Sequence, residues 1–210
     1  MPIRDEQKQQ THQALINAVL SLSRQGRTFS SMSLREITGE VNLAPATFYR
    51  HFQNMDELGL ELIDHLSIYL KSSFSQVYKL AIQQPDSHQQ RLNLLLDFVD
   101  QRPDYWSFFI HERSSGSVRI RKALQREMLF LVEYTATTMQ QIQDFNKLQD
   151  HDSLMTFAEM FVNMSFCWAL QWLDLSYEAD LDLRQIQQQK LKTKALLQLK
   201  LLYSGIQNWS

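Results

Sequence analysis

The most informative segment of the chain is Ala44-Pro45-Ala46-Thr47-Phe48-Tyr49-Arg50-His51-Phe52. Pro45 is typical of the first position of a helix, where its missing N–H group has no intrahelical partner to lose. Phe48 and Phe52 are four residues apart and therefore point to the same side of a helix, where we expect them to be buried. Asn42-Leu43-Ala44 predicts a turn before Pro45. The segment as a whole predicts a helix of two turns held by two phenylalanines.

Another short helix is predicted just before this turn. Ser33 stands three residues before Glu36, the spacing of a capping box, in which the hydroxyl and the carboxylate each bind a backbone amide at the helix start. The apolar positions expected to face inward are Leu34, Ile37 and Val41. A longer helix over residues 5–25, closed by Gly26, precedes both short helices.

Two short helices joined by a turn and backed by a third are typical of a helix-turn-helix, whose second short helix enters the DNA major groove. Arg50 can bind a guanine through two hydrogen bonds, and Thr47 can offer its hydroxyl or its methyl group to a base. Tyr49 and His51 lie at the flanks, where phosphate contacts are more natural than base contacts.

The start of the first short helix is expected to bind the opposite phosphates through its side chains and free amides. The predicted DNA-contacting residues are Ser33, Arg35, Pro45, Ala46, Thr47, Tyr49, Arg50 and His51. The alternative is that Thr47, Tyr49 and Arg50 form the solvent-facing polar side of an ordinary helix.

Composition favours a folded, all-helical, cytoplasmic protein. The chain has 210 residues, 44% of them apolar, with five Gly and four Pro and no sustained β-branched alternation. The single cysteine, Cys167, fits a reducing compartment, and the N-terminus lacks the pattern of a signal peptide. The apolar stretch from Met155 to Leu175 is interrupted by polar residues, so we interpret it as a buried helix and not as a membrane span.

The net charge of −2 is unevenly divided along the chain. Through Met55 there are six Lys or Arg and four Asp or Glu, giving +2, so the remainder carries −4. A mildly basic head on an acidic body is compatible with DNA binding, although the charge alone does not establish it.

Helical periodicity continues to the end of the chain. Asn54 and Glu57 predict the start of a connecting helix that runs to about Ile82. Further helices are expected to end near Pro103, to follow the loop Ser114–Ser117 as far as about Ile142, and to span 153–176 and 183–206. The prediction is an all-α protein of about nine helices, with a DNA-binding domain at 1–54 and a ligand-binding and dimerisation domain at 55–210.

These motifs resemble the DNA-binding head of the TetR family. The resemblance rests on Ser33-Leu34-Arg35-Glu36-Ile37, on Leu43 through Phe52 and on Asp56-Glu57-Leu58. It implies an all-helical homodimer that binds a palindromic operator as a repressor and has a variable domain for an effector. Met55 stands where many members have a phosphate-binding lysine. Pro45, the segment Asp56–Leu60 and the string Glu112–Ser117 are similar to the FabR-like and DesT-like branch, which implies repression of unsaturated fatty acid synthesis and a long-chain acyl thioester such as acyl-CoA as effector.

A set of large apolar residues could line a tunnel for an acyl chain, since Met and aromatic side chains adapt to irregular shapes. The set comprises Phe98, Tyr105, Trp106, Phe109, Met128, Met160, Phe161, Met164 and Trp168. The alternative is that these residues are ordinary core. Arg113, Arg119 and Arg121 could bind the phosphates of the ligand, or they could belong to a solvated face.

The helix at 153–176 is apolar over most of its circumference, which predicts packing against a second subunit together with the final helix. Two other functions were considered. A helical enzyme has no support, because the six His are scattered, no metal-ligand pair is found and Cys167 lies in an apolar helix. A regulator of efflux that responds to a drug-like hydrophobic effector remains open.

Overall fold

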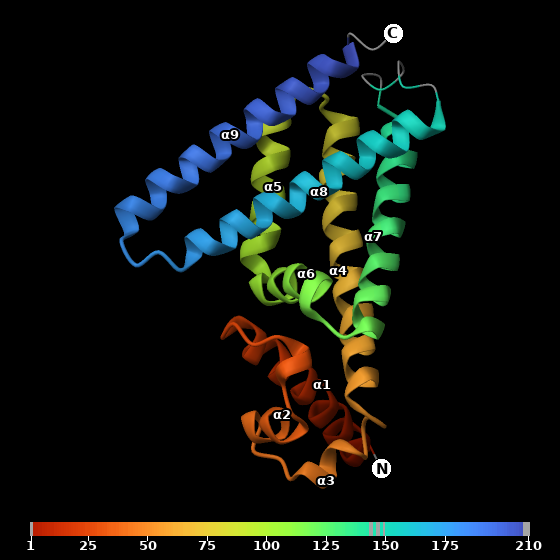
Figure 1. The fold of residues 1–210 in the computed structure, drawn as a ribbon, viewed down its shortest axis with the longest axis vertical. Coiled ribbons are helices and arrows are strands. Elements are labelled where there is room, and N and C mark those ends of the chain that lie inside the picture. Colours follow the sequence, from red (N-terminus) through yellow and green to blue (C-terminus); the bar gives the residue numbers. More distant parts are fainter. Residues whose placement is uncertain (1, 143–144, 146–147, 149, 208–210) are drawn as a thin grey trace. The chain divides into compact units, whose positions relative to one another are not determined.

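The computed structural model describes residues 2–142, 145, 148 and 150–207. Over these residues the chain is all-helical, with nine α-helices, one 3₁₀ turn and no strand, which confirms the predicted fold class. Figure 1 shows the order of the helices along the chain.

Packing divides the chain into two compact units. The first unit combines Met1–Ile68 with Pro103–Arg126, and the second combines Tyr69–Arg102 with Glu127–Ser210. Helix α4 (Met55–Gln83) and helix α7 (Val118–Met139) each contribute residues to both units. The functional boundary at residue 54 stays a prediction, since these units are defined by packing alone.

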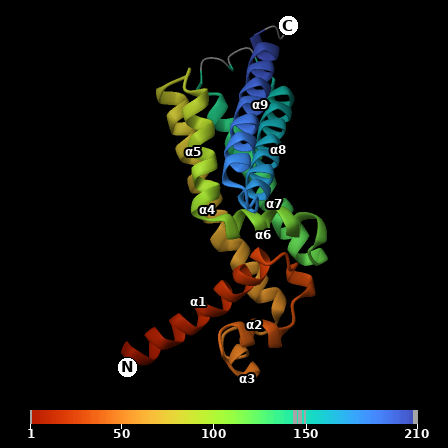
Figure 2. The ribbon, with the colours of Figure 1, turned by 90° about the vertical axis from the view of Figure 1, so that its left-hand side faces the viewer.

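The first unit is built on helix α1 (Pro2–Arg24), which packs against α2 (Leu34–Glu40) and α6 (Pro103–Ser115). Its core includes Leu15, Ile16 and Val19 of α1, each fully buried. Gly26 ends this helix with a φ of +82°, which is the left-handed conformation that glycine adopts without strain. The 3₁₀ turn η1 (Phe29–Ser31) then leads into α2, which packs against α3 (Pro45–Phe48), as Figure 2 shows.

The second unit is built on the antiparallel pair α8 (His151–Ser176) and α9 (Leu181–Gln207), which both pack against α5 (His88–Gln101). Helix α8 is the one helix of the described residues that is long and apolar enough to cross a membrane by length and composition. Its buried side chains include Phe157, Phe166 and Trp172, and Trp172 donates a hydrogen bond to Asp100 of α5 at 2.8 Å. Packing inside the unit accounts for much of its apolar surface.

Two predicted boundaries differ from the structure. The α-helical part of α3 ends at Phe48, because Arg50 N–H and His51 N–H bond three residues back, to Thr47 and Phe48, instead of four. The second of the two predicted turns is therefore 3₁₀-like at Arg50 and His51, whereas Phe52 N–H still bonds four residues back, to the Phe48 carbonyl at 3.0 Å. Helix α6 also extends through Ser115, so the break predicted at 114–117 is confined to Gly116 and Ser117.

Candidate nucleic-acid interface

The start of α2 is fixed by the predicted capping box. The Ser33 hydroxyl accepts a hydrogen bond from Glu36 N–H at 3.2 Å, and the Glu36 carboxylate accepts one from Ser33 N–H at 2.8 Å. The bond from the Ser33 backbone is the main reason why the pKa of Glu36 lies below its usual value. Arg27 adds an ion pair to Glu36 at 2.9 Å. Arg27 is a supporting residue that the sequence reasoning missed, since no motif marks it.

The turn between α2 and α3 depends on Asn42. Its φ of +55° lies in the left-handed region, which asparagine tolerates better than most residues. Asn42 N–H bonds to the Gly39 carbonyl at 3.1 Å, and Leu43 N–H bonds to the Thr38 carbonyl at 2.8 Å. The chain therefore leaves α2 with two of its last carbonyls satisfied, and Pro45 begins α3 at the predicted position.

Phe48 and Phe52 anchor α3 in the first unit. Phe48 is fully buried, Phe52 is 2% exposed, and their ring centroids are 5.5 Å apart. The His12 ring of α1 stacks on Phe52 at 4.5 Å and is held by Glu61 through a 2.5 Å contact. This anchoring leaves the opposite side of α3 facing solvent.

The solvent-facing side carries most of the predicted DNA contacts. Pro45, Ala46 and Arg50 are exposed, Tyr49 is 65% exposed and Thr47 is half-buried. Ser33 and Arg35 are exposed at the start of α2. Within the described part of the chain, neither Arg35 nor Arg50 forms an ion pair or a side-chain hydrogen bond. Two guanidinium groups are therefore available to an anionic partner.

His51 differs from its neighbours on this surface. Desolvation lowers the pKa of its imidazole below the usual value, and the nearby His12, Lys8 and Arg50 lower it further. A histidine with a lowered pKa is mostly neutral at pH 7. A phosphate contact by His51 would therefore use an N–H group and not a full positive charge.

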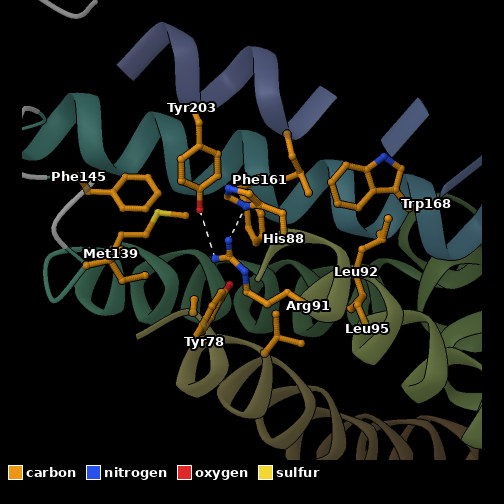
Figure 3. A pocket seen from close by; sticks show the side chains of 14 residues that line it. Tyr78, His88, Arg91, Leu92, Leu95, Met139, Phe145, Phe161, Trp168 and Tyr203 are labelled. Atoms are coloured by element: carbon orange, nitrogen blue, oxygen red, sulfur yellow. Dashed lines mark hydrogen bonds between the residues drawn. The ribbon is translucent and has the colours of Figure 1, made fainter. Parts of the chain in front are cut away.

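The second unit contains an apolar cavity among α4, α5, α7, α8 and α9, shown in Figure 3. It is small, with a cavity volume of about 30 Å³, because the side chains around it nearly fill the space. The lining residues are Val77, Tyr78, Ala81, His88, Arg91, Leu92, Leu95, Met139, Ile142, Phe145, Phe161, Trp168, Leu199 and Tyr203.

Two residues of the predicted ligand set, Phe161 and Trp168, line this cavity. Tyr105, Trp106 and Phe109 are buried in the first unit, on α6. The remaining members lie in the second unit but are not among the lining residues; they are Phe98, Met128, Met160 and Met164. Most of the set is buried or half-buried, although Met160 is 48% exposed, and the sequence pattern could not tell which neighbours surround each side chain.

The predicted phosphate-binding arginines belong to the first unit and do not line the cavity. Arg119 pairs with Asp56 at 3.6 Å, and Arg121 donates a hydrogen bond to the Gly116 carbonyl at 2.6 Å. Arg113 is exposed in the last turn of α6. Arg119 and Arg121 thus have contacts within their own unit, at the break between α6 and α7.

The α8–α9 pair also has an exposed apolar surface. Met160 of α8 and Leu197 and Leu201 of α9 are 48%, 57% and 64% exposed. A hollow beside them is lined by Thr156, Met160, Leu201 and Gly205, among others. Large apolar side chains gathered on one face are typical of an interaction surface.

The structure combines a helix-turn-helix, formed by α2 and α3, with further helices in an all-helical chain over the described residues. Residues 25–62 match the model of the family described as "Bacterial regulatory proteins, tetR family". This range contains α2, the turn and α3, so the match covers the segment that is predicted to bind DNA.

Solved structures show the same fold over nearly the whole chain. Regulatory protein TetR from Rhodobacter sphaeroides is 20% identical with a TM-score of 0.57, covering 87% of this chain and 97% of that one. A protein from Pseudomonas aeruginosa PAO1 assigned as a transcriptional regulator is 15% identical with a TM-score of 0.64, covering 96% and 95%. The multidrug binding protein EbrR, complexed with imidazole, is 14% identical with a TM-score of 0.54, covering 88% and 93%. The chain therefore shares its fold with these proteins, and residues 25–62 match the tetR family model.

Proposed function

We propose that this protein is a cytoplasmic, non-enzymatic transcriptional repressor that binds a palindromic operator as a homodimer and responds to a hydrophobic effector. The observation that carries the proposal is the exposed, unpaired Arg50 on a short helix that Phe48 and Phe52 anchor. An exposed arginine on a recognition helix is suited to reading guanine in the major groove. The family match over the same residues supports this role.

In this proposal the head residues have different roles. Arg50 and Thr47 contact bases, Pro45 and Ala46 let the helix approach the groove closely, and Tyr49 and His51 contact phosphates. Ser33 and Arg35 contact phosphates from the start of α2. Of these, Arg35 and Arg50 provide positive charge, so binding is expected to weaken as salt rises.

Selection of random duplex DNA by the purified full-length protein tests the operator proposal. We expect enrichment of a palindrome whose half-sites are about one helical turn apart, because a two-fold dimer presents two identical heads. Arg50→Ala should lose this enrichment, whereas Lys79→Ala, which removes an exposed charge from the second unit, should retain it. Equal recovery of all sequences by the unaltered protein would contradict the proposal.

The exposed apolar surface of α8 and α9 supports a second copy of this chain as its partner. Leu201→Glu places a charge on that surface and should convert a dimer to monomers in analytical ultracentrifugation. Ile68→Glu is a matched control, since Ile68 is 69% exposed on α4, outside this surface. A monomeric unaltered protein, or a dimer that survives Leu201→Glu, would remove α8 and α9 from the proposed interface.

The effector proposal has two versions. The resemblance of the string Glu112–Ser117 to the FabR-like and DesT-like branch favours a long-chain acyl thioester. The apolar lining of the small cavity suits a hydrophobic effector of either kind, including a drug-like one, provided that its walls move apart to admit the molecule. Native mass spectrometry of the purified protein separates the two versions: co-purified acyl thioester supports the first, and a protein that binds cationic drugs but no acyl species supports the second.

A further inference from the structure

Lys8 of α1 is an exposed cation without a partner in its own chain. It lies near the start of the helix and forms no ion pair or side-chain hydrogen bond within the described residues. In both views of the fold, the first turns of α1 and helix α3 lie at the same end of the first unit (Figures 1 and 2). Lys8 is therefore at the end of the unit that carries the candidate nucleic-acid interface.

The position of Lys8 is set by His12, one turn further along α1. The His12 ring stacks on Phe52 with centroids 4.5 Å apart, and it lies 5.7 Å from the ring of His51. Residues four apart lie on the same side of a helix, so Lys8 is on the side of α1 that faces Phe52 and His51. The chain just after α3 and the start of α1 thus form one continuous surface.

The protonation of His51 reflects the same arrangement. Desolvation is the main reason why the pKa of His51 is lowered, and the charges of His12, Lys8 and Arg50 lower it further. A charge has such an effect only at short range, so Lys8 and Arg50 both lie near the imidazole. His51 therefore has two cationic neighbours, one on α1 and one beside it in the chain.

No carboxylate of the described residues neutralises Lys8. Glu61 of α4 is bound by His12 at 2.5 Å and lies 3.9 Å from His65. Asp5, three residues before Lys8 on α1, is exposed and forms no ion pair with it. Like charges that gather without a counter-ion repel each other, and a polyanion relieves this repulsion. The backbone of duplex DNA is such a polyanion, with one negative charge per about 1.7 Å of helix axis.

We propose that Lys8 extends the DNA-binding surface onto α1 by contacting a backbone phosphate beside the segment that enters the major groove. This inference rests on the proposed role of the first unit in DNA binding, and it adds a third full positive charge to those of Arg35 and Arg50. A phosphate contact strengthens binding to every sequence alike, because it reads no base. Lys8 thus contributes to affinity and not to recognition of the operator sequence.

Fluorescence anisotropy of the full-length protein with labelled duplexes tests the contact through its salt dependence. Each phosphate contact contributes about 0.9 to the slope of log affinity against log salt concentration, and a dimer presents Lys8 twice. We expect Lys8→Gln to reduce the slope by about 1.8, so its deficit in affinity should shrink roughly tenfold between about 50 and about 200 mM salt. The ratio of affinities for the selected operator and a scrambled duplex should stay as in the unaltered protein.

Two variants and the choice of pH separate a phosphate contact from other roles of the charge. Lys8→Arg keeps the charge and should keep the slope. Lys122→Gln removes an exposed, unpaired lysine of the same unit, on α7, and should also keep the slope, which excludes an effect of net charge alone. Measurement at pH 8 keeps His51 neutral in the free protein, since its pKa lies below the ordinary value of 6.5.

A slope that Lys8→Gln leaves unchanged, or that Lys122→Gln lowers as much, would overturn the inference. A loss of operator preference in Lys8→Gln would overturn it as well, since Lys8 would then act on base recognition. Failure of the proposed function would look different. A protein that binds all duplexes alike, with a slope that Lys8→Gln reduces, would retain the phosphate contact and lose the role of an operator-binding repressor.

Discussion

The Glu112 carboxylate accepts a hydrogen bond from the Phe29 backbone N–H at 2.8 Å, although the two residues are 83 positions apart. Glu112 lies near the end of α6 and is only 1% exposed, and Phe29 begins the turn that leads to α2. The Glu112 carbonyl also accepts a bond from Gly116 N–H at 3.1 Å. Within the first unit, the string that begins at Glu112 therefore holds the segment before the helix-turn-helix.

Replacement of Glu112 tests this link through pH. Desolvation raises the pKa of Glu112 above its ordinary value of 4.5, so the folded state holds its proton more tightly than the unfolded state does. Below pH 4.5 the Glu112 carboxyl is protonated in both states, so it does not destabilise the folded protein. As pH rises from 4.5 through the raised pKa, the buried carboxylate lowers the free energy of unfolding, and this loss is complete above the raised pKa. Glu112→Gln keeps an acceptor for Phe29 N–H and removes the charge. We expect its melting temperature to exceed that of the unaltered protein at pH 8 and to match it near pH 4.5.

Glu112→Ala is the companion variant. It removes the acceptor as well as the charge, so it should melt below Glu112→Gln at both pH values, because a buried amide is then unsatisfied. A difference between Glu112→Gln and the unaltered protein that does not change with pH would contradict the raised pKa.

Gly59 is predicted to tolerate no larger residue. A Cβ atom at this position would lie 2.6 Å from Phe29 Cε1 and 2.7 Å from Ile120 Cδ1, within the core of the first unit. We expect Gly59→Ala to lower the free energy of unfolding by about 1–3 kcal/mol in urea titrations, the usual effect of overpacking. Gly39→Ala is the control, since a Cβ there meets nothing within 4 Å. If Gly59→Ala and Gly39→Ala are equally stable, the side chains around Gly59 move to admit the methyl group, and the prediction of overpacking is wrong.

Loss of the helix cap at Ser33 should destabilise α2. Ser33→Ala removes the acceptor for Glu36 N–H, which we expect to cost about 1 kcal/mol of unfolding free energy in urea titrations. Ser33→Thr keeps a hydroxyl and should lose much less. If the alanine and threonine variants are equally stable, the cap does not contribute to the stability of the unit.

Sequence reasoning located the head well because its signals are local. The capping box, Pro45 at the first helical position and the Phe48–Phe52 pair each depend on residues within one or two turns. The tighter end of α3 was not predicted, since four-residue spacing of two phenylalanines does not distinguish an α-turn from a 3₁₀-like one. The DNA contacts assigned to the exposed residues remain predictions.

The cavity was much less predictable than the head. Arg91 follows His88-Gln89-Gln90, a polar run that resembles a solvated helix start. Arg91 is nevertheless half-buried, and its Nη1 lies 3.4 Å from the hydroxyl of Tyr203, which is 112 residues away in the sequence. Trp106 shows the opposite case: its burial was expected, but it packs in the first unit and not at the cavity. Long-range packing decides both positions, and periodicity carries no information about it.

The division of roles on α3 is the central claim, and binding of two variants to the selected operator and to a scrambled duplex tests it most directly. Fluorescence anisotropy would give the ratio of the two dissociation constants at fixed salt. We predict that Arg50→Ala reduces this ratio by about tenfold or more, through loss of a base contact worth roughly 1–3 kcal/mol. Tyr49→Phe should weaken both complexes alike and keep the ratio. An unchanged ratio for Arg50→Ala, or equal loss of the ratio in both variants, would contradict the account.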